Sequence, residues 1–330
     1  MTTTTRNSQT FNLSDGRVLG FAEYGDPDGS PLLYFHGYPS SRLEANATEQ
    51  IGRRLRVRIL ALDRPGFGLS TPQPDRRIVD WPADVQEFAK GQNLSEFAVL
   101  GLSGGGPFAL ACGHILPRSM VTGLGLFASG PPWAAGPSQM SYMRRVTRFA
   151  AYSWPSGLRV VLHATVRLVE WIVGTRIISR RIDGWLEEQD RKKEEARSAG
   201  RDDTPSAAAL KRPTSERRED LVRLIIGEPF LQGAEAAVHE ARLLSSDDWG
   251  FRFEDVQYDP IWIWHGALDT SAPIGMIRYL AERLPHTKLR VFEGDTHYTM
   301  FKHLEGAISD LLGMAGHEKA PSNTSRITAE

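Results

Sequence analysis

The chain has 330 residues, of which 41% are hydrophobic and 24% are charged, so it can form a folded core and is not of the disordered or low-complexity class. Its 39 lysines and arginines nearly balance its 40 aspartates and glutamates, which argues against nucleic acid as a partner. The single cysteine, Cys112, excludes intramolecular disulfides and any cysteine-based metal cluster.

The amino terminus has no apolar stretch typical of a signal peptide, and no segment is typical of a transmembrane helix. The longest uncharged runs, residues 97–117 and 119–143, are interrupted by glycines or by consecutive prolines. We therefore predict a cytoplasmic protein. Residues 316–330 are polar, and we interpret them as a disordered tail.

The first part of the chain alternates short apolar runs with helical patterns. The runs predict strands at residues 8–13, 18–24, 31–35, 58–62, 97–102 and 121–127. Helices are expected between them at residues 44–55, 79–92 and 107–116. Strands that alternate with helices form βαβ units, so the fold class is α/β, with a mostly parallel sheet covered by helices on both faces.

The pattern changes after about residue 130, and no strand is expected before residue 250. Helices are predicted there at residues 157–178, 185–206, 217–226 and 234–244. Strands resume at residues 260–265 and 288–292, with helices at 274–284 and 297–314. We therefore predict a core formed by residues 1–130 and 250–315 and interrupted by a helical cap, residues 131–249.

The predicted cap combines apolar, aromatic and basic side chains. One helix has an apolar stripe, made of Leu158, Val161, Leu162, Leu168, Val169 and Ile172. Most cap aromatics are expected to pack against the core and to favour an apolar substrate: Trp133, Tyr142, Phe149, Tyr152, Trp154, Trp171, Trp185 and Phe230. We interpret the basic face as solvated, with contact to an anionic membrane surface as the lesser alternative: Arg159, Arg167, Arg176, Arg180 and Arg181.

A candidate nucleophile lies in the sequence Gly101-Leu102-Ser103-Gly104-Gly105, which follows an apolar strand and precedes a small-residue helix. This strand, turn and helix are the context of a nucleophile elbow, in which small neighbours allow the chain to turn sharply around the serine. The alternative is a plain glycine turn that happens to contain a serine. We predict that Ser103 is the nucleophile.

A serine nucleophile needs a base and an acid that orients the base. Asp269 lies in the loop after the strand at 260–265, and His297 lies in the loop after the last strand. Because the carboxyl ends of parallel strands share one edge of a sheet, both side chains should converge on Ser103. The other candidates are weaker, since they suit a helix cap, a turn, a helix or a packed strand better: Asp295, His286, His303 and His265.

The oxyanion of an acyl-transfer reaction must be bound by backbone N–H groups. We predict that these belong to Gly104, directly after the nucleophile, and to Tyr38, in the loop after the strand at 31–35. The glycine-rich loop at residues 63–70 lacks the spacing of a phosphate-binding loop. We therefore interpret it as a structural loop that shapes the entrance to the same site.

Together these motifs resemble the α/β-hydrolase fold superfamily, and especially its helical-capped branch of esterases, lactonases, C–C bond hydrolases and epoxide hydrolases. The residues that carry the resemblance are His36-Gly37-Tyr38-Pro39, residues 63–68, residues 101–105, Asp269 and His297. It covers residues 8–130 and 250–314, and it implies an eight-stranded sheet, a cofactor-free serine mechanism and a pocket between core and cap. A serine at position 103 disfavours dehalogenase and epoxide hydrolase chemistry, which uses an aspartate nucleophile.

The resemblance implies hydrolysis of an ester, lactone or thioester of a small to medium apolar substrate through an acyl-enzyme, with no cofactor and no metal. A C–C bond hydrolase or an acyltransferase with the same triad is the first alternative. A non-catalytic ligand-binding member of the fold is the second. The oligomeric state is left open.

Overall fold

The structure is a computed structural model, and it describes residues 6–198 and 212–314. The tail expected at residues 316–330 and the end of the helix expected at 185–206 lie outside these residues. No helix in the described part of the chain is long and apolar enough to cross a bilayer.

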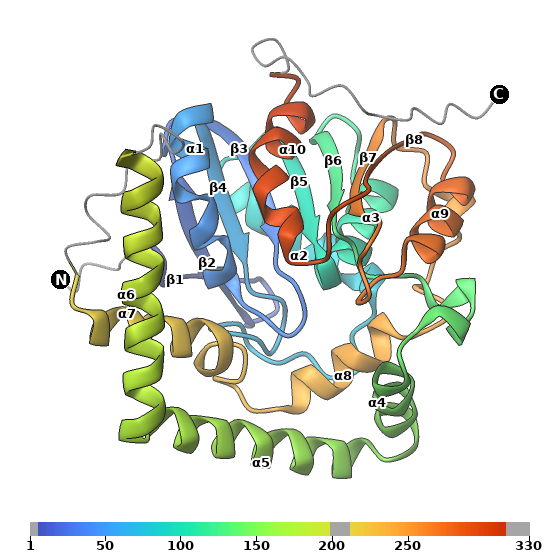
Figure 1. The fold of residues 1–330 in the computed structure, drawn as a ribbon. Coiled ribbons are helices and arrows are strands. Elements are labelled where there is room, and N and C mark those ends of the chain that lie inside the picture. Colours follow the sequence, from blue (N-terminus) through green and yellow to red (C-terminus); the bar gives the residue numbers. More distant parts are fainter. Residues whose placement is uncertain (1–5, 199–211, 315–330) are drawn as a thin grey trace.

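An eight-stranded sheet forms the centre of the molecule, as the sequence predicts (Figure 1). Its strands are β1 (Gln9–Asn12), β2 (Val18–Gly25), β3 (Ser30–Phe35), β4 (Val57–Leu62), β5 (Phe97–Leu102), β6 (Val121–Phe127), β7 (Ile261–Gly266) and β8 (Thr287–Phe292). The spatial order is β1-β2-β4-β3-β5-β6-β7-β8. The strand β2 pairs antiparallel with β1 and β4, and all other neighbours are parallel.

Helices cover both faces of the sheet because its central strands are apolar on both sides. On one face lie α1 (Glu49–Leu55) and α10 (Leu304–Leu311), and on the other lie α2 (Trp81–Gly91), α3 (Gly106–Ile115) and α9 (Ile274–Arg283). Successive residues of β3 serve opposite faces, since Leu33 packs with α2 and α3, whereas Leu32 packs in the cluster that contains α10. The helix expected at 44–55 is divided into a 3-10 helix (Arg42–Thr48) and α1.

The segment between β6 and β7 contains helices and no strand among its described residues. These helices are α4 (Tyr142–Ser153), α5 (Pro155–Gly174), α6 (Arg176–Ser198), α7 (Thr214–Val222), a π-helical turn (Arg223–Gly227) and α8 (Glu235–Leu244). Figure 1 shows α4, α5 and α8 together at one end of the sheet, with α5 farthest from it. Further short 3-10 helices lie in the loops at Ile78–Asp80, Trp133–Ala135, Pro137–Gln139, Phe253–Asp255 and Thr299–His303.

The expectation that most aromatic side chains of this segment pack against the core is wrong. Trp133 is buried, but six of the eight are exposed: Tyr142, Phe149, Tyr152, Trp154, Trp171 and Trp185. The predicted apolar stripe is also divided, because Leu158, Leu162 and Val169 are half-buried whereas Val161, Leu168 and Ile172 are exposed. The reason is that α5 packs mainly on α4, α6 and α8, so only part of its apolar surface is covered.

Two clusters of buried ion pairs join this helical segment to the loops of the core. Arg42 pairs with Asp63 at 2.9 Å and with Glu228 at 2.8 Å. Glu240, in α8, pairs with Arg64 at 2.5 Å and with Arg76 at 2.6 Å. Charges removed from water in this way have to keep their partners, so these contacts fix the position of α8 relative to the sheet.

Candidate active site

Ser103 lies at the turn between β5 and α3, in a 3-10 helix that spans Ser103–Gly105. Its φ is 48°, in the left-handed region that side chains rarely adopt. The neighbouring backbone is close, since a Cβ atom on Gly101 would lie 2.5 Å from the carbonyl oxygen of Gly105. A Cβ on Gly105 would in turn lie 2.2 Å from the carbonyl oxygen of Phe35. The glycines of the motif are therefore required by space as well as by the turn.

The loops after β5, β7 and β8 bring the three predicted side chains together. The Ser103 hydroxyl oxygen lies 3.0 Å from His297 Nε2, and His297 Nδ1 lies 2.6 Å from Asp269 Oδ2. The other oxygen of Asp269 accepts the backbone N–H groups of Ser271 at 2.7 Å and of Ala272 at 2.8 Å. Fixed in this way, the carboxylate holds the imidazole with its second nitrogen toward the serine, which is the arrangement that a general base requires.

The buried carboxyl of Asp269 is kept ionised by its neighbours. Burial acts to raise its pKa, but the hydrogen bond and charge of His297 and the N–H of Ala272 lower that pKa below its usual value. His265, on β7, donates from Nε2 to the Ala272 carbonyl oxygen at 2.7 Å and lies 3.5 Å from Asp269 Oδ2. Burial lowers the pKa of His265, so a neutral ring packs behind the carboxylate, in agreement with its interpretation as a packed histidine.

The two predicted oxyanion donors lie side by side at the mouth of the turn. A Cβ atom on Gly104 would lie 2.7 Å from the Tyr38 Cβ and 3.2 Å from the Tyr38 nitrogen, so the two residues are in contact. Gly104 is in the first turn of a helix, where N–H groups have no partner within the helix. The backbone N–H of Tyr38 donates to no other described residue. Both groups are thus available to an oxyanion formed next to Ser103.

Buried polar groups that the sequence analysis missed hold the Tyr38 loop in place. The Gly37 N–H donates to the carboxylate of Glu44 at 2.9 Å, and the Tyr34 hydroxyl donates to the same side chain at 2.9 Å. Arg64 donates to the carbonyl oxygen of His36 at 2.5 Å and to that of Gly37 at 2.8 Å. Nothing in the local sequence around these residues indicates this role, and only their contacts in the folded chain reveal it.

A pocket of about 270 Å³ opens at the triad, between the strand ends and the helices α4 and α8. Its apolar wall is formed by Pro107, Pro131, Trp133, Ala241 and Leu244. Its polar groups are Tyr38, Ser103, Thr147, Ser245, Ser271 and His297. Two arginines that the sequence analysis did not single out, Arg144 and Arg148 of α4, also line it. No aspartate or glutamate lines the pocket among the described residues.

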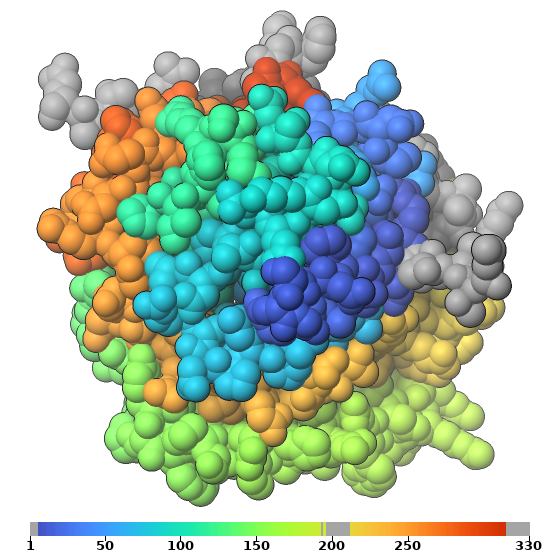
Figure 2. Space-filling view, turned by 180° about the vertical axis from the view of Figure 1, so that it is seen from behind, coloured from blue at the N-terminus to red at the C-terminus, as the bar shows by residue number. Residues whose placement is uncertain are grey.

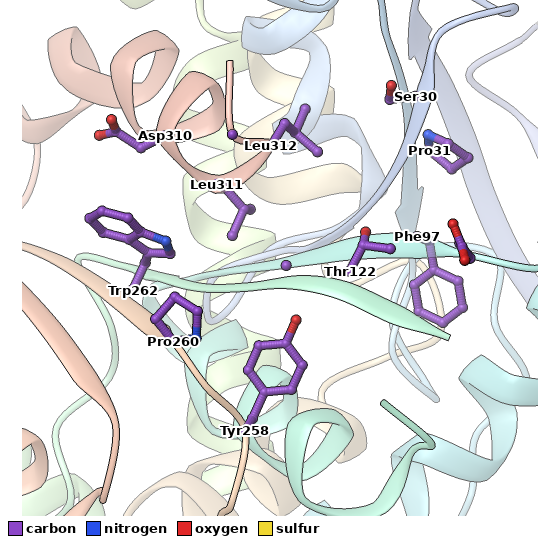
Figure 3. A pocket seen from close by; sticks show the side chains of 13 residues that line it. Ser30, Pro31, Phe97, Thr122, Tyr258, Pro260, Trp262, Asp310, Leu311 and Leu312 are labelled. Carbon is purple, nitrogen blue, oxygen red and sulfur yellow. The ribbon is translucent and has the colours of Figure 1, made fainter. Parts of the chain in front are cut away.

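A second cavity, of about 460 Å³, lies at the opposite end of the sheet (Figure 3). Its walls include residues at the amino ends of several parallel strands, such as Ser30 of β3, Phe97 of β5 and Trp262 of β7. The amino ends of these strands are remote from the loops that carry Ser103 and His297. Asp310, at its rim, is paired with Arg290. Its described lining residues do not include a nucleophilic side chain hydrogen-bonded to a histidine base, so this cavity is not the candidate active site.

The other candidates from the sequence lie away from the serine. Asp295 accepts hydrogen bonds from Thr299 at 2.8 Å and from His303 at 2.8 Å, so it stabilises the turn that begins the last helical region. His286 lies at the amino end of β8, away from the edge of the sheet that carries Ser103 and His297. Among the described residues, no group of three histidine, cysteine or acidic side chains could hold a metal ion.

Comparison with known proteins agrees with this architecture. A model of the alpha/beta hydrolase fold family matches residues 30–304. Proline iminopeptidase of Arabidopsis thaliana is 31% identical over 125 residues, which cover 36% of this chain and 31% of that protein, so the chain spans about a third of this curated relative.

Solved structures share the fold over nearly the whole chain. An esterase from Exiguobacterium antarcticum is 18% identical, with a TM-score of 0.58 over 93% of this chain and 98% of its own. The enol-lactonase from Burkholderia xenovorans LB400 is 14% identical, with a TM-score of 0.60 over 92% of this chain and 100% of its own. At identities this low, the structural similarity shows a common fold alone.

Proposed function

Because this chain belongs to the α/β-hydrolase fold family, we propose that it is a serine hydrolase that cleaves an ester, lactone or thioester through an acyl-enzyme. Ser103 is the nucleophile, His297 the general base and acid, and Asp269 the orienting carboxylate. The observation that carries the proposal is the continuous hydrogen-bonded series from Asp269 through His297 to Ser103 at the wall of a pocket.

In the first half of the reaction, the Ser103 oxygen attacks the substrate carbonyl carbon while His297 Nε2 takes the hydroxyl proton. The negative charge that develops on the carbonyl oxygen is bound by the N–H groups of Gly104 and Tyr38. Asp269 stabilises the imidazolium that forms, because its Oδ2 accepts a hydrogen bond from His297 Nδ1–H, with 2.6 Å between the two heavy atoms. His297 then donates its new proton to the leaving group, and an ester links Ser103 to the acyl part of the substrate.

In the second half, water takes the place of the leaving group. His297 removes a proton from the water molecule, the resulting oxygen nucleophile attacks the acyl carbon, and the proton returns to Ser103. Every group required for both halves is supplied by protein side chains and backbone, so the proposed mechanism uses no cofactor and no metal.

The pocket supports a small to medium substrate with an apolar body. Its volume of about 270 Å³ is small, and Trp133, Pro131 and Leu244 form an apolar wall beside the serine. We propose that the segment 131–249 acts as the cap, since α4 and α8 supply part of this lining. A peptide with a free amino terminus fits less well, because its positive charge would lie near Arg144 and Arg148.

The proposal is tested with a panel of p-nitrophenyl esters and lactones, using the wild-type protein and Ser103→Ala. We expect hydrolysis by the wild type, and a loss of kcat of at least about 10³-fold in the variant with an unchanged unfolding transition. A fluorophosphonate probe should label the wild type at Ser103 and leave the variant unlabelled. Near-normal activity of Ser103→Ala would overturn the proposal.

Product analysis separates this reaction from the other reactions that the same triad supports. An ester hydrolase releases an acid and an alcohol in equal amounts. An acyltransferase releases the alcohol while a second acceptor gains the acyl group, and a C–C bond hydrolase forms an acid from a diketone. Stoichiometric binding of a ligand without turnover would indicate a binding protein.

A further inference from the structure

Two arginines of α4 face the pocket that contains Ser103, but their surroundings differ. Arg148 donates to Asp247 at 2.8 Å, and its guanidinium lies 4.8 Å from the centre of the Trp133 ring. Its charge is therefore paired with a carboxylate, and one face of the guanidinium is covered by an aromatic ring. Arg144 is different, because it forms no ion pair within 4 Å among the described residues, and the carboxylate whose charge acts on it most is that of Asp269. One of its amino groups donates to the carbonyl oxygen of Ser271.

Arg144 is therefore a positive charge held at a fixed place within the candidate site. The Ser271 carbonyl anchors it two residues from Asp269, whose own carboxylate is engaged by His297 and two backbone N–H groups. Burial lowers the pKa of Arg144, but a guanidinium remains charged at neutral pH. It has five N–H donors, and a single neutral acceptor leaves most of them without a partner.

The charge of Arg144 is offset only from a distance by Asp269, whose carboxylate is already engaged by His297, so the anion of a ligand would stabilise this half-buried cation. The pocket contains no such group among the described residues, since none of its lining side chains is acidic. The planar donors of arginine match a carboxylate, which accepts two of them in parallel. The missing partner therefore has the chemistry of a carboxylate carried by the substrate.

We propose that Arg144 binds a carboxylate group of the substrate and that the enzyme acts on esters or lactones that carry a free acid in addition to the scissile bond. This inference rests on the proposed function and narrows it. The substrate would place its acyl carbon at Ser103, its apolar body along Trp133 and Leu244, and its carboxylate at Arg144. The apolar substrate expected from the sequence thereby gains one charged end.

The test compares mono-p-nitrophenyl glutarate with the matching ester in which a neutral amide replaces the free carboxylate. After subtraction of the spontaneous rates, the wild type should show a kcat/KM about tenfold or more higher for the acid, because the guanidinium forms charge-assisted hydrogen bonds with the carboxylate and not with the amide. In Arg144→Gln the kcat/KM for the acid should fall much further than that for the neutral ester, so that the preference disappears. Free glutarate should inhibit the wild type more strongly than the variant.

The matched control is Arg145→Gln, which removes a neighbouring arginine of the same helix. Arg145 is exposed and donates to the carbonyl oxygens of Met140 and Ser138, so its loss should leave the preference intact. Equal kcat/KM values for the two esters in the wild type would overturn the inference, as would an equal loss of both in Arg144→Gln. Absence of all hydrolysis that depends on Ser103 would instead overturn the proposed function.

A separate observation concerns the outer corner where α5 meets α6. Apolar side chains lie exposed there, with Leu168 at 54%, Trp171 at 69% and Ile177 at 72% of full exposure. Arg176, Arg180 and Arg181, in the first turns of α6, are exposed as well. None of the three arginines forms an ion pair with another described residue. We refer to these six residues as the corner patch.

The charge of this region differs from that of the whole chain. Residues 141–186 contain eight arginines, no lysine and two acidic residues, an excess of six positive charges, whereas the whole chain has a net charge of −1. A second copy of the chain docked face to face would bring these like charges together. A surface with negative charge and an apolar interior can bind both the arginines and the apolar side chains of the corner patch.

We propose that the corner patch binds the surface of an anionic phospholipid bilayer. Tryptophan favours the headgroup region, and each arginine gains from the negative surface potential. In Figure 1, α5 and the start of α6 lie at the outer edge of the molecule, and Figure 2 shows the same residues along its rim from behind. The corner can therefore reach a flat surface without obstruction from the core.

Co-sedimentation with vesicles tests this proposal. The wild type should sediment with vesicles that contain phosphatidylserine at low salt, and it should not sediment with phosphatidylcholine alone or at high salt. Each of Arg176→Gln, Arg180→Gln and Arg181→Gln should weaken binding by about fivefold, and Trp171→Ser should weaken it further. Arg53→Gln on α1, which is also exposed, is the control.

Soluble ester hydrolysis by each variant shows that it is folded, because none of these residues lines the active-site pocket. Sedimentation that does not depend on phosphatidylserine would overturn the membrane proposal. So would a dimer in analytical ultracentrifugation that Trp171→Ser dissociates, since the patch would then be an interface between copies.

Discussion

Glu240 of α8 and Arg64 of the loop after β4 form an ion pair with an oxygen to nitrogen distance of 2.5 Å and with neither side chain exposed to solvent. Arg64 also donates to the carbonyl oxygens of His36 and Gly37, directly before Tyr38. The Tyr38 hydroxyl in turn donates to the Ala237 carbonyl oxygen of α8 at 2.7 Å. The helical insertion and the loop that carries a proposed oxyanion donor therefore share one hydrogen-bonded network.

Glu240→Ala should destabilise the protein and impair turnover together. It leaves the buried guanidiniums of Arg64 and Arg76 without a counter-charge, and loss of one partner from a buried pair costs about 3 kcal/mol or more. Denaturant unfolding measures the free energy of unfolding. The kcat on an activated ester reports whether the Tyr38 loop still holds the proposed oxyanion donor in position. Glu187→Ala, on the exposed side of α6, is the control and should change neither quantity. Unchanged stability of Glu240→Ala would contradict this network.

The same carboxylate predicts a loss of stability in acid. Burial acts to raise the pKa of Glu240, but the charges of Arg64 and Arg76 outweigh it and lower that pKa from 4.5 to about 2. Between these values the unfolded chain binds the proton and the folded chain does not. The stabilisation by Glu240 is therefore present above pH 4.5 and is lost as the pH falls toward 2.

Melting temperatures measured across this range should decline more steeply for the wild type than for Glu240→Gln, which has no proton to bind at this site. Glu187→Gln should follow the wild type. Parallel curves for the wild type and Glu240→Gln would show that another group governs the acid transition.

Asp269→Asn should reduce kcat by about 10³- to 10⁴-fold with little effect on folding. The amide oxygen can still accept the N–H groups of Ser271 and Ala272, which leaves the amide NH₂ facing His297 Nδ1. Nδ1 must then accept a hydrogen bond, so the proton moves to Nε2 and the ring cannot take one from Ser103. Steady-state kinetics and thermal unfolding of the variant check this. A fall in kcat matched by an equal loss of folded protein would contradict it.

Gly104→Ala should reduce kcat by about 10²-fold or more, because its methyl group would meet Tyr38 Cβ at 2.7 Å and displace one of the two proposed oxyanion donors. The measurement is kcat on an activated ester, with fluorophosphonate labelling to show that Ser103 stays accessible. Gly184→Ala is the control, since a Cβ there has no other atom within 4 Å and a helix favours alanine over glycine. A variant of Gly104 with normal kcat would remove this residue from the oxyanion site.

The sheet and the positions of Ser103, Asp269 and His297 on strand-end loops could be predicted because each rests on local signals. Apolar runs mark the strands, glycines mark the elbow, and parallel strands bring their carboxyl ends to one edge. The roles of Glu44, Arg64 and Arg144 could not be predicted in this way. Each is a single charged residue whose partners are identified only by the folded structure or, for Arg144, lie in the proposed substrate.

The insertion shows a second reason why some features of the structure could not be predicted from the sequence. Helical periodicity placed α5 correctly, with bounds of Pro155–Gly174 against the expected 157–178. Periodicity indicates which residues share a face, but it does not say what covers that face. The exposed Trp171 and Leu168 show that apolar side chains of a helix do not always face the core.

The insertion also leaves and rejoins the sheet at strands that are direct neighbours, since β6 pairs with β7 along Leu124–Phe127. A segment whose two ends are fixed so close together can change in length or sequence at little entropic cost to the rest of the chain. Under the proposed function, the triad belongs to the core and part of the pocket lining to the insertion, so changes in the insertion can alter the substrate. Evolution can exchange the insertion while the core stays intact.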